Sequence, residues 1–405
     1  MTSSESYLAR YGASMMNTFG TPKRVFVRGE GVYLWDADGR RYLDLLAGLA
    51  VNSLGHGHPG VVEAVCDQLA TLGHVSNFFA TPPQIRLGER LAALVTRNAP
   101  STPAKVFLVN SGTEANEAAF KVTRRAHATD PMRPGRTRLV AMEGAFHGRT
   151  SAALALTWNP GYRMPFEPLP GEITFVPYGD ERALAGALDD SVAAVVIEPI
   201  QGENGVVVPP PDFLAAARSL TQEVGALLWL DEVQTGIGRT GEWLAHLPTG
   251  ITADLVTVAK GLGAGFPVGA CIATGPAAGA LGPGSHGTTF GGNPVAARAA
   301  LAVLDHLDAN DVLSHVRRTG EHLARGIESL RHPLVDHVRG AGLLLGVVLA
   351  QPVANAVADA ALDAGFVINA PRPSILRLAP PLVINPEDLD SFIEALPGLL
   401  DRSPR

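Results

Sequence analysis

Seven short apolar segments recur through the middle of the chain, and helical stretches separate most of them. Most neighbouring segments lie roughly 17 to 35 residues apart, which leaves room for a crossover helix. Strands spaced in this way form a mainly parallel sheet that helices bury. The candidate strands are 105–109, 138–142, 173–176, 193–197, 226–230, 254–258 and 268–273. The sequence therefore predicts an α/β fold with a mainly parallel, seven-stranded sheet.

Three of these segments end in polar or glycine-rich sequence. The first runs into Ser111, Gly112 and Thr113, where a helical pattern begins, and two later segments run into Asp231 and Lys260. In an open, mainly parallel sheet, ligands bind beyond the carboxyl ends of the strands. We therefore expect Gly112, Asp231 and Lys260 to meet at one site.

Lys260 closes an apolar run and precedes several glycines. Burial would lower the pKa of its amine, and the neutral amine is the form that attacks an aldehyde. Gly112 lies in a strand-to-helix turn whose free N–H groups suit a phosphate, with Ser111 or Thr113 as the helix cap. An amine, a phosphate cradle and the carboxylate of Asp231 are what pyridoxal phosphate requires. For Lys260 alone, the alternative is a solvated lysine at a strand end.

Six motifs resemble, in the same order, those of the class III pyridoxal-phosphate aminotransferases of fold type I, the group of the ornithine and 4-aminobutyrate aminotransferases. They are NSGTEANEAAFK from Asn110, GAFHGRT from Gly144, EPIQGENGV from Glu198, LDEVQTGIGRTG from Leu230, AKGLGAGFPVGA from Ala259 and TTFGGNP from Thr288. The resemblance implies a large cofactor-binding domain and a small α+β domain built from both termini. We place the N-terminal segment at 1–75, the large domain at 76–300 and the C-terminal part of the small domain at 301–405.

The resemblance also implies roles at the cofactor. Lys260 is expected to form the Schiff base and then to move the substrate proton, Asp231 to pair with the pyridine nitrogen, and Gln234 to lie near the phenolic oxygen. Thr289 is expected to reach the phosphate from the partner subunit of a homodimer. The other expected cofactor contacts are Ser111, Gly112, Thr113, Phe146, His147 and Glu198. Taken singly, Asp231 could be a helix cap and Thr289 an ordinary loop hydroxyl.

Two arginines resemble the family's substrate-binding residues. A guanidinium fork binds a carboxylate through two parallel hydrogen bonds, which suits Arg149 and Arg377. The resemblance places an acid, Glu203, against Arg377. An ω-amine donor has no carboxylate beside its reacting amine, so Glu203 would neutralise Arg377 while that donor is bound. Glu203 would swing away when 2-oxoglutarate or glutamate enters, because Arg377 then takes the α-carboxylate and Arg149 the γ-carboxylate.

Two further segments resemble the acetylornithine-using members of the family. Leu49 stands near the position at which enzymes for free ornithine carry a tyrosine, and the segment 74–79 also matches. Ser76 and Asn77 are expected to line the substrate pocket, with a loop cap as the alternative. The resemblance thus implies transfer of the δ-amino group of N2-acetylornithine to 2-oxoglutarate in arginine biosynthesis. Alternative donors are 4-aminobutyrate, succinylornithine, an N-succinyl-diaminopimelate precursor and ornithine; an aminomutase and a noncatalytic cofactor-binding protein also stay open.

Bulk properties narrow the class of protein. The net charge is −7 and the basic residues are scattered, which argues against nucleic acid as a partner. The two cysteines, Cys66 and Cys271, lack metal-ligand spacing, and we interpret both as buried thiols in a reducing compartment. No apolar run approaches the roughly 18 residues of a membrane span, and no secretory signal is visible. We therefore expect a cytoplasmic enzyme without a metal.

Overall fold

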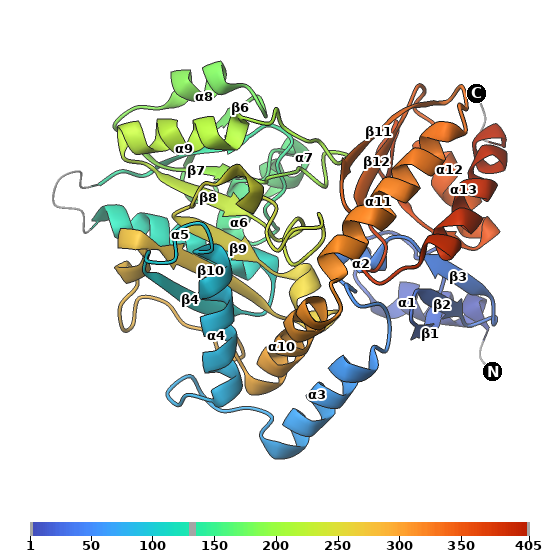
Figure 1. Cartoon of the computed structure of the whole chain (residues 1–405), viewed down its shortest axis with the longest axis horizontal. Helices are drawn as coiled ribbons and strands as arrows, with labels where there is room; N and C mark the ends of the chain where they lie inside the picture. The colour runs from blue at the N-terminus through green and yellow to red at the C-terminus, as the bar shows by residue number, and fades with distance from the viewer. Residues whose placement is uncertain (1–2, 129–134, 403–405) are drawn as a thin grey trace.

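The computed structural model describes residues 3–128 and 135–402. Its central feature is a seven-stranded sheet (Figure 1). Its strands follow the order β4-β10-β9-β8-β7-β5-β6. All neighbours are parallel except β10, which runs antiparallel to both β4 and β9. The strands are β4 Ala104–Val109, β5 Arg138–Met142, β6 Glu172–Val176, β7 Val192–Ile197, β8 Leu227–Asp231, β9 Leu255–Val258 and β10 Gly269–Thr274. The seven predicted strands are confirmed, each with boundaries within one residue.

Helices cover both faces of this sheet, as Figure 1 shows. The α-helices of residues 3–128 and 135–402 are α1 Ser4–Ser14, α2 Ala47–Ala50, α3 Pro59–Thr71, α4 Pro82–Val95, α5 Gly112–Ala128, α6 Ser151–Ala155, α7 Pro160–Arg163, α8 Glu181–Ala187, α9 Phe213–Val224, α10 Pro294–Ala309, α11 Val312–Ser329, α12 Ala354–Ala364 and α13 Pro386–Asp401, and some of them pack on the smaller sheets. Alternate residues of one strand enter different cores: Trp229 packs with α5, whereas Leu228 and Leu230 pack with α9 and α10. Burial on both faces explains why these strands are almost wholly apolar.

Strands from both ends of the chain share a second, smaller sheet. It has the order β1-β2-β3-β13, with β1 Phe26–Glu30, β2 Tyr33–Asp36, β3 Arg41–Asp44 and β13 Phe366–Val367. Strands β2 and β3 form a hairpin around the turn 36–39, and β13 pairs with β3 in parallel. The predicted combination of N- and C-terminal segments is therefore confirmed, and helices α1 and α13 both lie on that side of the molecule (Figure 1).

A third sheet carries one of the candidate site residues. Its order is β11-β12-β15-β14, with β11 Val335–Ala341, β12 Leu344–Leu349, β14 Asn369–Arg372 and β15 Ile375–Leu378. Arg377 lies in β15, where all four residues are buried. Helix α11 packs on β11 and β12, while α12 packs on β14 and on β15.

The prediction for the two cysteines is half wrong. Cys271 is buried in β10, but Cys66 is exposed on α3. The inward face of α3 is formed by Val61 and Ala64, and Cys66 lies off that face. Across residues 3–128 and 135–402, no helix is both long and apolar enough to span a bilayer.

Candidate active site

Residues that follow four strands of the large sheet line a cavity of about 260 Å³ together with the loop after β5. The predicted residues that it brings together are Gly112, Thr113, Phe146, His147, Arg149, Glu198, Glu203, Asp231, Gln234 and Lys260. Asp231 ends β8, Glu198 follows β7, Lys260 follows β9, and Gly112 follows β4. The site therefore lies at the carboxyl edge of the sheet, as the positions of these residues along the strands predicted.

Lys260 is held in an unusual backbone conformation. Its φ is +39°, a left-handed value that costs a non-glycine residue about 1–3 kcal/mol and is found mainly at functional sites. The next residue is held in place because Ser53 Oγ donates a hydrogen bond of 2.7 Å to the carbonyl of Gly261. Burial lowers the pKa of the Lys260 amine, although the negative charge of Glu203 acts in the opposite direction. Its amine is thus more easily deprotonated than an ordinary lysine's.

Asp231 is a buried carboxylate with a full set of partners. Its Oδ2 accepts a hydrogen bond from Asn116 Nδ2 at 2.8 Å and lies 2.7 Å from His147 Nδ1. Its Oδ1 accepts the N–H of Val233 at 3.0 Å. Burial alone would lower the pKa of His147, but the hydrogen bond and charge of Asp231 outweigh it and raise that pKa. Both oxygens of the Asp231 carboxylate thus have hydrogen-bond partners inside the protein.

Asn116 is a site residue that the sequence reasoning missed. It lies on α5, one turn beyond Gly112, and is 1 % exposed. Its Nδ2 also donates to the carbonyl of His147 at 2.6 Å, so Asn116 links the backbone of His147 to the carboxylate of Asp231. The available signal was an asparagine four residues after the predicted phosphate turn, on the same helix face as that turn.

Glu198 is the second acid at the base of the cavity. Its Oε1 accepts the backbone N–H of Phe146 at 2.9 Å. Burial raises its pKa to about 7, and the charge of nearby Asp231 acts in the same direction. Glu198 is therefore poised to hold or release a proton near neutral pH.

The turn at the start of α5 leaves little room for side chains. A Cβ atom on Gly112 would lie 2.6 Å from Val233 Cγ1, so this position accepts only glycine without rearrangement. The first N–H groups of a helix have no partner within the helix, and they attract anions. Ser111 Oγ accepts the N–H of Glu114 at 3.3 Å, which makes it a helix cap. Thr113 Oγ1 lies 2.6 Å from Thr150 Oγ1.

Arg377 does not itself line the cavity but contacts two residues that do, Glu203 and Gln234, and it is 1 % exposed. The predicted ion pair with Glu203 is present, with 2.5 Å between Arg377 Nη1 and Glu203 Oε1. The same nitrogen donates to Gln234 Oε1 at 3.2 Å, and Nε donates to Asn369 Oδ1 at 3.1 Å. Nη2 is buried without a partner in the described part of the chain. Burial would raise the pKa of Glu203, but Arg377 outweighs burial and lowers it.

Three predicted residues lie elsewhere in this single chain. Ser76, Asn77 and Thr289 line a different cavity of about 770 Å³. Asn77 Nδ2 donates to the carbonyls of Thr288 and Gly291, each at 3.1 Å. These residues are therefore close to one another but not part of the cavity of Lys260.

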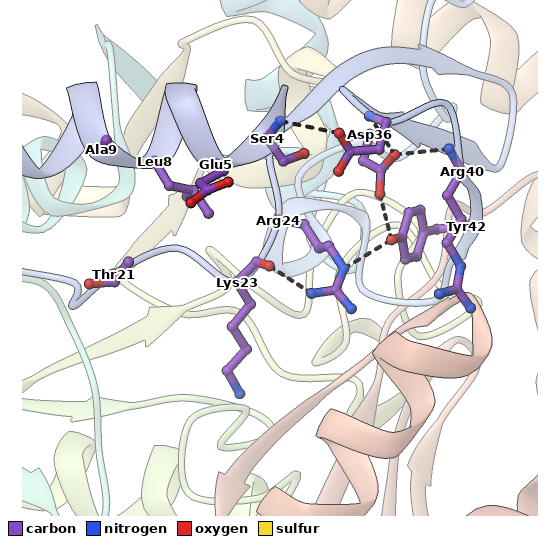
Figure 2. A pocket seen from close by; sticks show the side chains of 11 residues that line it. Ser4, Glu5, Leu8, Ala9, Thr21, Lys23, Arg24, Asp36, Arg40 and Tyr42 are labelled. Atoms are coloured by element: carbon purple, nitrogen blue, oxygen red, sulfur yellow. Dashed lines mark hydrogen bonds between the residues drawn. The ribbon is translucent and has the colours of Figure 1, made fainter. Parts of the chain in front are cut away.

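A third cavity, of about 720 Å³, lies between α1 and the first hairpin strands (Figure 2). Within it Arg24 Nε donates to the Tyr42 hydroxyl at 3.0 Å, and that hydroxyl donates to Asp36 Oδ2 at 2.7 Å. None of the predicted site residues lines it. Arg24, Tyr42 and Asp36 are thus engaged with one another.

The whole architecture and the cavity of Lys260 define a known class of enzyme. The family model of the class III aminotransferases matches residues 16–400, and the chain belongs to that family. The cofactor of the class is pyridoxal 5′-phosphate, as predicted. The cavity fits this cofactor because it combines a buried carboxylate, an amine with a lowered pKa and a helix N-terminus free of side-chain bulk.

Two similar proteins of known name belong to one kind of aminotransferase within this family. The chain is 54 % identical over 402 residues to an acetylornithine aminotransferase of Streptomyces coelicolor, covering 99 % of this chain and 97 % of the relative. It is 56 % identical over 393 residues to that of Mycolicibacterium smegmatis, covering 97 % of each.

Solved structures show the same fold. The ornithine aminotransferase of Toxoplasma gondii superposes with a TM-score of 0.93 at 30 % identity, covering 99 % of this chain and 96 % of that one. The N-acetylornithine aminotransferase of Stenotrophomonas maltophilia has a TM-score of 0.82 at 34 % identity, covering 97 % and 98 %.

Proposed function

We propose that this chain transfers the δ-amino group of N2-acetylornithine to 2-oxoglutarate, giving N-acetylglutamate 5-semialdehyde and glutamate. The observation that carries the proposal is the unequal state of the two arginines. Arg377 is paired with Glu203, whereas Arg149 opens on the cavity and forms no ion pair with any acid of residues 3–128 and 135–402. An enzyme for two substrates with carboxylates at different distances needs one constant and one conditional carboxylate site.

Bound pyridoxal phosphate supplies an electrophilic aldehyde and a ring that accepts the electrons of a substrate carbanion. Lys260 offers an amine whose burial favours the reactive neutral form. Asp231, which His147 and Asn116 hold in place, would pair with the protonated ring nitrogen of the cofactor. The start of α5 at Gly112 would hold the phosphate.

Glu203 and Arg377 adapt the inner wall to each substrate. While an ω-amine is bound, Glu203 keeps the Arg377 charge neutralised, since breaking a buried ion pair costs about 3–5 kcal/mol. When 2-oxoglutarate enters, its α-carboxylate replaces that of Glu203, whose side chain is 32 % exposed and would turn outward. The unpartnered Nη2 of Arg377 gives the incoming carboxylate a second donor. Arg149 takes the distant carboxylate in both cases.

The choice of N2-acetylornithine as donor rests on the relatives and on the segment after β3. Relatives 48 to 56 % identical to the chain, among them those described above, are named acetylornithine aminotransferases. Residues 47–50 form a left-handed turn, with φ of +66° at Leu49, whose side chain is exposed. No phenol is offered at that position for a free α-amino group, which favours a donor whose α-nitrogen is acetylated.

We further propose that the enzyme is a cytoplasmic homodimer with the domain division 1–75, 76–300 and 301–405. Phe78 and Phe290 are 92 % and 61 % exposed beside the cavity that holds Ser76, Asn77 and Thr289. Burying such side chains against a second copy would stabilise the assembly by about 1.5–3 kcal/mol each. Thr289 of one subunit would then complete the phosphate site of the other.

The experiment is a comparison of half-reactions. The holoenzyme is mixed with N2-acetylornithine, ornithine or 4-aminobutyrate in the absence of an acceptor, and the visible absorbance of the cofactor is followed. We expect the fastest loss with N2-acetylornithine and recovery on addition of 2-oxoglutarate. If the absorbance falls faster with another donor, that donor is the substrate instead of N2-acetylornithine. If it does not change with any donor or with glutamate, the aminotransferase activity is refuted.

A further inference from the structure

The two substrate arginines are held by different kinds of partner. Arg377 is buried among an acid and two side-chain carbonyl oxygens, as described above. Arg149 is exposed and, within residues 3–128 and 135–402, has no ion pair or hydrogen bond. Fixing a long cationic side chain in one rotamer costs conformational entropy, which a partner must offset. Something other than an acid must therefore hold Arg149 in a binding orientation.

Aromatic rings surround the Arg149 guanidinium. Its central carbon lies 3.6 Å from the centroid of the Tyr162 ring and 5.7 Å from that of Phe146. Both distances fall within the range of cation–π attraction, and Tyr162 is at direct stacking distance. A stacked guanidinium uses its face for the ring and leaves the N–H groups on its edge free for a carboxylate.

The ring of Tyr162 is itself fixed by the short helix α7. Asn159 caps this helix by accepting the N–H of Gly161 at 2.9 Å. At its last residue, the Arg163 guanidinium lies 4.6 Å from the ring centroid of Phe175, which is on β6. Neighbouring residues thus anchor α7 to the large sheet, and Tyr162 projects toward Arg149.

The backbone on the other side of this contact is fixed as well. Thr150 N donates to Thr113 Oγ1 at 3.3 Å, and the two threonine hydroxyls are 2.6 Å apart. Thr113 is in the first turn of α5, beside the candidate phosphate site. Arg149 therefore extends from a chain segment tied to the cofactor end of the cavity, and its free end meets Tyr162.

We infer that Tyr162 is a positioning residue that holds the Arg149 guanidinium for the substrate's distal carboxylate and takes the place of a counter-ion. An acid beside Arg149 would compete with the substrate, as Glu203 does at Arg377. An aromatic face does not compete, because the carboxylate binds the guanidinium edge. The inference rests on the role proposed above for Arg149.

The test uses holoenzyme with Tyr162→Leu, Tyr162→Phe, Arg149→Ala and the Tyr162→Leu/Arg149→Ala double variant. Loss of an exposed cation–π contact of 0.5–1 kcal/mol corresponds to a rise in KM of about two- to fivefold. We expect Tyr162→Leu to show that rise for 2-oxoglutarate and for N2-acetylornithine alike, with kcat little changed. Phenylalanine should restore the wild-type KM because it keeps the ring. In the Arg149→Ala background, Tyr162→Leu should have no further effect.

Tyr7 offers a matched control, since it is also 37 % exposed and lies 5.6 Å under the Arg10 guanidinium in α1, outside the cavity. Tyr7→Leu should leave both KM values unchanged. If Arg149→Ala raises KM but Tyr162→Leu does not, or if the two effects simply add, the inference is wrong and the proposed role of Arg149 stands. If Arg149→Ala leaves both KM values unchanged, that role is wrong, and the inference falls with it.

Discussion

Nδ1 of His147 lies 2.7 Å from Oδ2 of Asp231, and both side chains are buried in the wall of the cavity. This contact raises the pKa of His147 in spite of its burial. Asn116 supports the same carboxylate oxygen from α5. The acid that we propose as the partner of the cofactor's ring nitrogen is thus fixed by two buried side chains.

Replacing Asn116 by alanine should weaken cofactor binding. A hydrogen bond to a charged group contributes about 1.5–3 kcal/mol, and its loss here would raise the dissociation constant for pyridoxal phosphate by about tenfold or more. Titration of the apoprotein with the cofactor, followed by protein fluorescence, measures this constant. Asn98→Ala is the control, because Asn98 also hydrogen-bonds to backbone carbonyls but lies outside the cavity. Equal effects of the two substitutions would contradict the prediction.

Lys260→Ala should abolish covalent attachment of the cofactor and lower kcat by about a thousandfold, within the usual range for a general base. Borohydride reduction of the holoenzyme followed by peptide mass spectrometry should place the cofactor on Lys260 alone. Lys121 contacts His286 outside this cavity, and Lys121→Ala should behave as wild type. Attachment at another lysine would overturn the assignment.

Glu198 should make the stability of the apoprotein depend on pH. Burial raises its pKa to about 7 in the folded protein, against an ordinary value of 4.5. The folded state therefore keeps a proton that the unfolded state has lost between these values, and the stabilisation present below pH 4.5 is lost as the pH rises through 7. The loss is about 3 kcal/mol at most, since one pKa unit corresponds to about 1.4 kcal/mol.

Thermal unfolding of the apoprotein at pH 5 and pH 8 tests this expectation. Glu198→Gln should be less sensitive to this pH change than the wild type, while Glu172→Gln, at an exposed position on β6, should not differ from it. An unchanged pH dependence in Glu198→Gln would show that the carboxyl ionises normally.

Thr289 offers a test of the shared active site. Thr289→Ala should raise the cofactor dissociation constant by about tenfold, the effect of losing one hydrogen bond to a charged group. In mixed dimers of Lys260→Ala and Thr289→Ala subunits, a site shared across the interface regains both native residues in one of its two copies. Activity at limiting pyridoxal phosphate should then reappear on mixing. No recovery would mean that Thr289 acts within its own subunit or not at all.

The sequence predicted the large sheet well because burial on both faces leaves a strong signal. Strands such as β7, in which all six residues are buried, read as continuous apolar runs. The residues after these strands were correctly expected to meet, since parallel strands end at one edge of a sheet. The contact between Glu203 and Arg377 was also expected, although 174 positions separate them.

Other features depend on information that local sequence does not carry. Asn116 lies on a helix with many buried positions, so periodicity could not single it out. Helix α3 buries only a narrow stripe, and for that reason Cys66 was wrongly placed in the core. The left-handed turn at 47–50 includes alanine and leucine, residues that give no warning of positive φ. Ser76, Asn77 and Thr289 lie apart from Lys260 in one chain, and only an assembly can test their roles.

The most direct test of the account concerns Glu203, measured in single-turnover half-reactions with N2-acetylornithine and with glutamate. Glu203→Ala leaves Arg377 without its acid, and we expect the donor half-reaction to slow by about 10- to 100-fold relative to the glutamate half-reaction. Glu203→Gln should slow the donor half-reaction by an intermediate amount. Glu242→Ala, which removes an exposed ion pair with Arg317, should change the rate of neither half-reaction. Equal losses in the two half-reactions would contradict the account, because Glu203 would then not distinguish the two substrates.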